Sequence, residues 1–137
     1  PYRLEMGTRF KVTPKITNMY KYWDDKIRVS LEEELANDKS PILVNAASSE
    51  YFKAAQLDKL NAKVITTVFK DTAKDGSYKV NMQYAKLARG YVARYIIQNN
   101  VQTEDELRAF DLKGYQFSSA DSTDDQFVYL RDVPQKP

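Results

Sequence analysis

The segment from residue 84 to residue 98 carries three cationic side chains and no acidic residue. At about 100° per residue of a helix, Lys86 and Arg94 fall on one side with Gly90 between them, and Arg89 lies on the flank beyond Lys86. A glycine inside a helix costs about 1 kcal/mol relative to alanine, so we interpret Gly90 as a bare patch that lets a phosphate approach. Fixed cations around such a patch suit contact with a nucleic-acid backbone. The alternatives are a merely solvated basic face and a glycine that permits close helix packing.

A second polar group follows the apolar run at 42–44, which predicts a buried strand. Asn45, Ser48, Glu50 and Tyr51 come directly after this run, where the strand meets the start of a short helix. Ligands favour the carboxyl ends of strands in α/β-like sheets, and helix N-termini offer free N–H groups to anions. Asn45 could therefore bond a base edge, and Glu50 could act as an acid or base. The alternative is that Asn45 satisfies a turn and Ser48 only caps the helix.

Arg3 and Glu5 form a third candidate group near the start of the chain. In an extended segment, residues two positions apart project to the same side. These two side chains either line a cleft together, with Glu5 as a second candidate acid or base, or form a structural salt bridge.

Composition excludes several classes of chemistry. The 137 residues include no cysteine and no histidine, which excludes thiol chemistry, disulfides, zinc sites of the usual kind and imidazole bases within this chain. Only carboxylates and carbonyls remain as metal ligands, and we expect neither a metal site nor a bound cofactor. With 21 basic and 19 acidic residues the net charge is +2, so binding to nucleic acid must depend on where the charges lie.

The elements that position these groups follow from periodicity and turn signals. The expected elements are helices at 14–36, around 50–52, at 84–98 and at 103–110, and strands at 42–44, 63–69, 78–82, 115–117 and 127–130. This order predicts an α+β fold in which helices cover a mixed, largely antiparallel sheet. We expect one domain over 1–137, with an extended lead-in at 1–12 and a frayed tail at 132–137. No apolar run approaches the roughly 18 residues of a membrane span and no signal peptide is recognisable, so we expect a cytoplasmic protein without membrane contact.

Four segments taken together resemble the signature blocks of the YaaA peroxide-stress-response family, in order and in separation. They are PYRLEMG at 1–7, VNAASSEYF at 44–52, YAKLARGYVARYII at 84–97 and GYQF at 114–117. The resemblance runs from Pro1 to about Leu130. It implies that the chain is the C-terminal half of a longer protein with a compact α/β fold and a positively charged cleft. The missing N-terminal half would then be a partner, and it would hold the helix-hairpin-helix element of the family, whose signature is absent from this sequence.

The resemblance also implies a function and a set of residues. Proteins of this family are bacterial, are made under peroxide stress, limit available iron and so reduce Fenton damage, and are associated with DNA binding. The family's polar positions match Arg3, Glu5, Asn45, Ser48, Glu50, Tyr51, Lys86, Arg89, Gly90 and Arg94, and Ala46 stands where the family more often has leucine. We therefore expect a non-enzymatic protector that contacts DNA phosphates through Lys86, Arg89, Gly90, Arg94 and Arg3, beside a polar cleft of Asn45, Ser48 and Tyr51. The alternative is an enzyme acting on nucleic acid or nucleobases, with Glu5 or Glu50 as its acid or base.

Overall fold

The structure is a computed structural model that describes residues 15, 18–39 and 41–134. The chain divides into two compact units, one made of residues 1–43 and 47–64 and the other of residues 44–46 and 65–137. The expectation of a single domain stays a prediction, and the predicted lead-in at 1–12 lies outside the described residues. Within the described ranges, no helix combines the length and the apolar composition needed to cross a bilayer.

The first unit begins with two helices where the sequence predicts one. Helix α1 spans Met19–Trp23 and helix α2 spans Lys26–Asn37, and the predicted start near residue 14 lies outside the described residues. The single helix over 14–36 is wrong because Asp24 adopts φ 45°, a conformation that ends a right-handed helix. Aspartate is a weak helix former, which favours an end at this position. α1 itself begins at a cap, because the Asn18 side chain accepts a hydrogen bond from the Lys21 backbone N–H at 2.9 Å.

The same unit continues through α3 at Ser49–Ala54 and a 3-10 turn at Leu57–Lys59. The short helix predicted around 50–52 is confirmed by α3, which packs against α1. The buried apolar residues of this unit are Ala54, Leu57 and Leu60, among those described.

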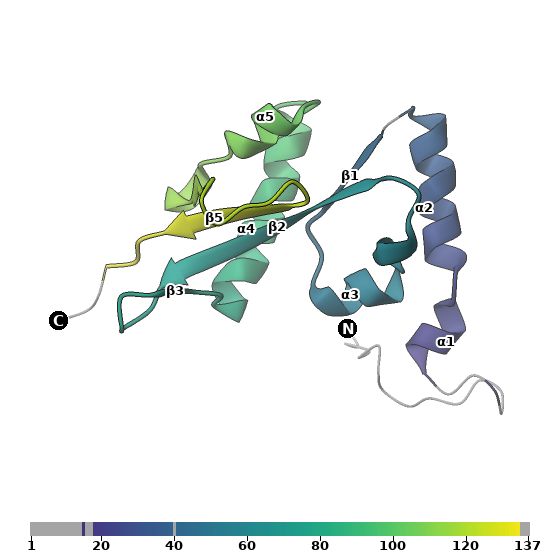
Figure 1. The fold of residues 1–137 in the computed structure, drawn as a ribbon, viewed down its shortest axis with the longest axis horizontal. Coiled ribbons are helices and arrows are strands. Elements are labelled where there is room, and N and C mark those ends of the chain that lie inside the picture. The colour runs from purple at the N-terminus through teal and green to yellow at the C-terminus, as the bar shows by residue number, and fades with distance from the viewer. Residues whose placement is uncertain (1–14, 16–17, 40, 135–137) are drawn as a thin grey trace. The chain divides into compact units, whose positions relative to one another are not determined.

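The described strands form one mixed, mostly parallel sheet with the order β1-β2-β5-β4, and β3 pairs with β2 (Figure 1). The strands are β1 at Ile42–Asn45, β2 at Lys63–Thr72, β3 at Tyr78–Lys79, β4 at Gln116–Phe117 and β5 at Gln126–Arg131. β2 and β5 run parallel from Thr66↔Gln126 to Asp71↔Arg131, whereas β3 and β4 add short antiparallel pairs.

The prediction of a largely antiparallel sheet is therefore wrong. Its two hairpin-like pairs, β2 with β3 and β4 with β5, are confirmed, but the longest pairing joins strands that are distant in sequence. Residues 73–125 separate β2 from β5 and contain α4 (Met82–Gln98), and a connection of this length and helical content allows parallel pairing.

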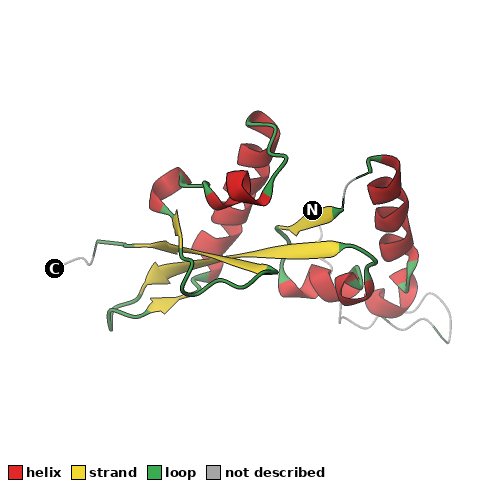
Figure 2. Ribbon diagram, turned by 45° about the horizontal axis from the view of Figure 1, so that its top comes forward, coloured by secondary structure: helices red, strands yellow, loops and turns green. Residues whose placement is uncertain are grey.

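The core of the second unit is aromatic. Phe69, Phe110, Tyr115, Phe127 and Tyr129 are each at most 1% exposed, and the Phe69 and Tyr129 rings stack with centroids 5.2 Å apart. α4 covers one face of the sheet (Figures 1 and 2). Edge-on packing of several of these rings stabilises the core further, beyond the contribution of their large buried apolar area.

A threonine cap opens the helix that precedes β4. Helix α5 spans Glu104–Arg108, slightly shorter than the predicted 103–110. The Thr103 hydroxyl accepts from the Glu106 backbone N–H at 3.2 Å and donates to the Glu106 carboxylate at 3.1 Å. Tyr129 fixes this helix to β5, because its hydroxyl donates to the Leu107 carbonyl at 2.6 Å.

Candidate nucleic-acid interface

Helix α4, which carries the predicted basic residues, is held at its start by an asparagine cap. It begins at Met82, two residues before the predicted start, because the Asn81 side chain accepts from the backbone N–H groups of Gln83 and Tyr84, both at 3.1 Å. Ala85, Ala88 and Val92 are buried along one side of the helix. Their spacing of three and four residues fixes which side of α4 faces away from the core.

The structure brings three of the four predicted α4 residues onto that outer side. Lys86, Gly90 and Arg94 are exposed, whereas Arg89 is half-buried at the edge of the buried side. Leu87 is apolar but 57% exposed, so it does not belong to the buried side of the helix. Its direction, about 100° from Lys86, lies nearer to Gly90 and Arg94 than to the buried alanines.

The cations of α4 differ from many others in their surroundings. Lys86, Arg89 and Arg94 form no ion pair with any described residue, and α4 itself contains no acid. By contrast, cations elsewhere in the described part of the chain pair with carboxylates, among them Arg28 with Glu32, Lys79 with Asp75, Arg108 with Asp105 and Arg131 with Asp71. Within the described part of the chain, no carboxylate neutralises the charges of α4.

Gly90 faces open space. A Cβ atom built at this position would meet no atom within 4 Å. Among the described residues, then, nothing packs closely against Gly90, which removes the helix-packing explanation for this part of the chain. The bare backbone lies between two exposed cations, as the phosphate interpretation requires.

Two further cations border α4, and the sequence pattern did not single them out. The Lys113 ammonium lies 5.5 Å from the centre of the Tyr91 ring, and the Arg131 guanidinium lies 4.8 Å from that of Tyr84 and 4.4 Å from that of Tyr115. A hollow of about 340 Å³ lies at this end of α4, lined by Tyr84, Lys113, Gly114, Arg131, Asp132, Val133 and Pro134. The contact between Arg131 and Tyr84 joins residues 47 positions apart, so no local pattern could reveal it.

A buried carboxylate fixes Arg131 in this position. Asp71 is 4% exposed and accepts hydrogen bonds from the Arg131 Nε and from the Tyr115 hydroxyl, the latter at 2.9 Å. Burial, followed by the bond to Asp71, raises the pKa of Tyr115 well above its ordinary value, so this hydroxyl remains a donor even at alkaline pH. The charge of Arg131 is thereby largely neutralised, whereas Lys113 has no carboxylate partner among the described residues.

The polar residues that follow β1 (Asn45, Ser48, Glu50 and Tyr51, the strand-end group) differ in their surroundings. Asn45 has a structural role. This residue is 5% exposed, its side-chain amide donates to the Thr66 hydroxyl at 3.3 Å, and its carbonyl accepts from the Thr67 hydroxyl at 3.4 Å. These bonds join β1 to β2 inside the second unit.

The other members of that group lie in the first unit. Ser48 is the N-cap residue of α3 without a capping bond from its side chain, Glu50 is half-buried, and Tyr51 is 49% exposed. Arg3 and Glu5 lie outside the described residues. A common cleft that joins these residues to α4 stays a prediction.

Two carboxylates near β3, those of Asp75 and Asp132, accept hydrogen bonds from neighbouring residues. Asp75 accepts from the Lys79 ammonium at 2.7 Å and from the Ser77 backbone N–H at 3.0 Å, and these bonds hold its pKa far below the usual range. Asp132 accepts from the Tyr78 hydroxyl, which raises the pKa of Tyr78. In the part of the chain that the structure describes, no three Asp or Glu side chains lie close enough together to hold a metal ion.

Comparison with known proteins identifies similar sequences. The family described as peroxide stress protein YaaA matches residues 1–121. A UPF0246 protein of Shewanella pealeana is 48% identical over 132 residues, which cover 96% of this chain and 51% of the relative. UPF0246 proteins of Idiomarina loihiensis and Ralstonia pickettii are 49% and 44% identical over 131 residues, 96% of this chain and 50% of each relative. The chain spans about half the length of the curated relatives it matches.

Proposed function

Because the chain belongs to the peroxide stress protein YaaA family, we propose that it serves the peroxide stress response by binding DNA through helix α4. The family supplies the physiological setting, and α4 supplies the contact surface. The observation that carries the proposal is that Lys86, Arg89 and Arg94 have no carboxylate partner among the described residues, on a helix without acids.

Helix geometry suits these cations to a phosphate backbone. Lys86 and Arg94 are eight residues apart, which corresponds to about 12 Å along the helix axis. Gly90 lies midway between them and leaves the backbone accessible. Contacts of this kind position a protein on nucleic acid without reading its sequence, so we expect little sequence preference.

Limitation of intracellular iron is the second part of the proposal. The chain has neither histidine nor cysteine, so an iron site within it would have only oxygen ligands. Such ligands suit magnesium, calcium or manganese better than a tight ferrous site. We therefore assign this effect to a partner or to another part of the protein, and the α4 surface to DNA.

A pair of triple variants with the same change in net charge tests the DNA contact. The first, K86A/R89A/R94A, removes the α4 cations. The second, K53A/K59A/K74A, removes three exposed lysines that form no ion pair with a described residue. Binding to a labelled duplex is measured by fluorescence anisotropy in about 0.1 M salt. Loss of three phosphate contacts should weaken binding on the order of 100-fold, and the control variant should remain within about 2-fold of the parent chain.

Equal losses in the two variants would show that only net charge matters and would refute a localised site on α4. Unchanged binding in K86A/R89A/R94A would exclude α4 as the contact surface. Circular dichroism of both variants should match the parent chain, because the substituted side chains carry no described ion pair.

A further inference from the structure

Lys113 has a backbone conformation that lysine rarely adopts. It lies in a 3-10 turn at Leu112–Gly114 with φ 60° and ψ 28°, in the left-handed region that favours glycine and asparagine. The next residue, Gly114, also has a positive φ, of 84°. Such conformations carry a local energetic cost and cluster at functional sites, so a lysine at this position needs a reason.

The turn places the side chain of Lys113 at the flank of α4. Its ammonium lies 5.5 Å from the centre of the Tyr91 ring. Viewed down the helix, the directions of Gly90, Arg94 and Tyr91 follow one another within about 100°. Lys113 therefore continues the cationic surface of α4 on its flank, beyond Arg94 and at the level of Tyr91.

The charge of Lys113 is available to an anion. The residue is exposed and forms no ion pair with a described residue, and the hollow of about 340 Å³ gives space beside it. Two other charged side chains line the same hollow. Arg131 is bound to Asp71, and the Asp132 carboxylate accepts hydrogen bonds from two hydroxyl groups. Among the described residues of this hollow, Lys113 is thus the cation that no carboxylate neutralises.

We propose that Lys113 is a further phosphate contact of the DNA-binding surface, which it extends from α4 onto the turn at Leu112–Gly114. This inference rests on the proposed function, because it adds a residue to the same surface. The cation–π contact with Tyr91 positions the ammonium without neutralising it, as a carboxylate would. Lysine contacts phosphate as a point charge and reads no sequence. Asparagine and glycine fit this backbone better but carry no charge, which explains a strained lysine here.

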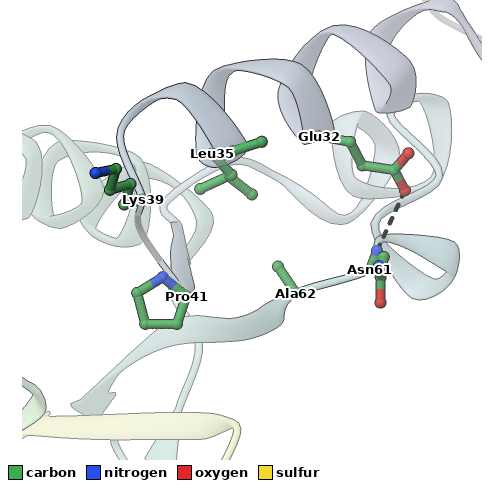
Figure 3. Close-up of a pocket in the computed structure, with 7 residues that line it drawn as sticks. Glu32, Leu35, Lys39, Pro41, Asn61 and Ala62 are labelled. Atoms are coloured by element: carbon green, nitrogen blue, oxygen red, sulfur yellow. Dashed lines mark hydrogen bonds between the residues drawn. The ribbon is translucent and has the colours of Figure 1, made fainter.

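Lys39 supplies a matched control in the first unit. It has nearly the same backbone conformation, with φ 53°, is exposed and forms no ion pair with a described residue. It also borders a hollow, of about 480 Å³ (Figure 3). Lys113→Asn and Lys39→Asn each remove one positive charge and introduce a residue that tolerates the left-handed conformation. The two variants therefore differ in where the charge is lost.

DNA affinity is measured by fluorescence anisotropy with a labelled duplex over a range of salt concentrations, for the parent chain, both asparagine variants and Lys113→Arg. Lys113→Asn should weaken binding by several-fold to about 10-fold in about 0.1 M salt and reduce the magnitude of the slope of log K against log salt concentration by about 0.9. Lys39→Asn should change neither quantity, and Lys113→Arg should retain both. The thermal midpoint of both asparagine variants should equal or exceed that of the parent chain, because asparagine relieves the strain.

Equal binding by Lys113→Asn and Lys39→Asn would overturn the inference. If K86A/R94A still lost affinity in that case, the proposed function would stand without Lys113, whereas unchanged binding in K86A/R94A would refute both. A loss that Lys113→Arg shares with Lys113→Asn would also overturn the inference, because it would assign the effect to the turn and not to the charge. A thermal midpoint lowered by Lys113→Asn alone would refute the strain from which the inference starts.

Discussion

Gly90 offers a prediction in which stability and binding change in opposite directions. The substitution Gly90→Ala adds a methyl group in the middle of α4, where it meets nothing within 4 Å. Alanine is favoured over glycine by about 0.5 to 1 kcal/mol in a helix interior. We therefore expect the free energy of unfolding to rise by about that amount, which corresponds to a Tm increase of about 2 to 4 °C for a chain of this size.

DNA affinity should fall in the same variant. If the bare backbone at Gly90 admits a phosphate, the new methyl group occupies that space and hinders the approach of the phosphate. Loss of one such contact at about 0.1 M salt weakens binding by several-fold to about 10-fold. The two quantities are measured on the same sample, by urea denaturation and by fluorescence anisotropy with a labelled duplex.

The matched control is Ala93→Gly, the reverse change on the exposed side of the same helix. It should lower the free energy of unfolding by about 0.5 to 1 kcal/mol, and it should not weaken DNA binding, because it removes a methyl group from the same face of the helix. Destabilisation by Gly90→Ala would show that something packs against this position, which would refute the open interface. Stabilisation with unchanged affinity would separate Gly90 from the contact surface.

Three further predictions concern the framework that holds α4. Asp71→Asn removes the buried charge that fixes Arg131, so it should lower the free energy of unfolding by about 3 kcal/mol in urea titrations, and a loss below about 1 kcal/mol would contradict the buried pairing. Thr103→Ala removes the cap of α5 and should cost about 1 kcal/mol by the same measurement, whereas Thr103→Ser should cost much less. Burial raises the pKa of Tyr115 and Tyr129 in the folded chain above the unfolded value of 10.0, so the unfolded state releases protons first. Stability should thus stay level up to about pH 9 and fall as the pH rises past 10, with a smaller fall in Tyr115→Phe; a flat profile to pH 11 would contradict this.

Local features of the fold were predictable from the sequence where one segment carried the whole signal. The helical periodicity of α4 and the helix start near residue 103 each depend on a few adjacent residues. The break at Asp24 was not predicted, because the apolar spacing from Trp23 to Ile27 continues across it.

Relations between distant segments could not be predicted in the same way. Parallel pairing of Val68 with Val128 depends on the path of the chain between β2 and β5, and both strands have the same pattern in either direction. The stacking of Arg131 on Tyr84 likewise has no local signature. The arrangement of Lys86, Arg89, Gly90 and Arg94 could be predicted because a single helix positions all four residues. The arrangement of the strand-end group could not, because it depends on how separate elements meet.

The salt dependence of DNA binding tests the central claim most directly. The claim is that unpaired cations on α4 exchange their counterions for phosphates. The measurement is the slope of log K against log salt concentration for the parent chain, for K86A/R94A and for the control K53A/K74A. Removal of two phosphate contacts should reduce the magnitude of the slope by about 1.8, and the control should leave it unchanged. A slope in K86A/R94A equal to that of the parent chain would contradict the account.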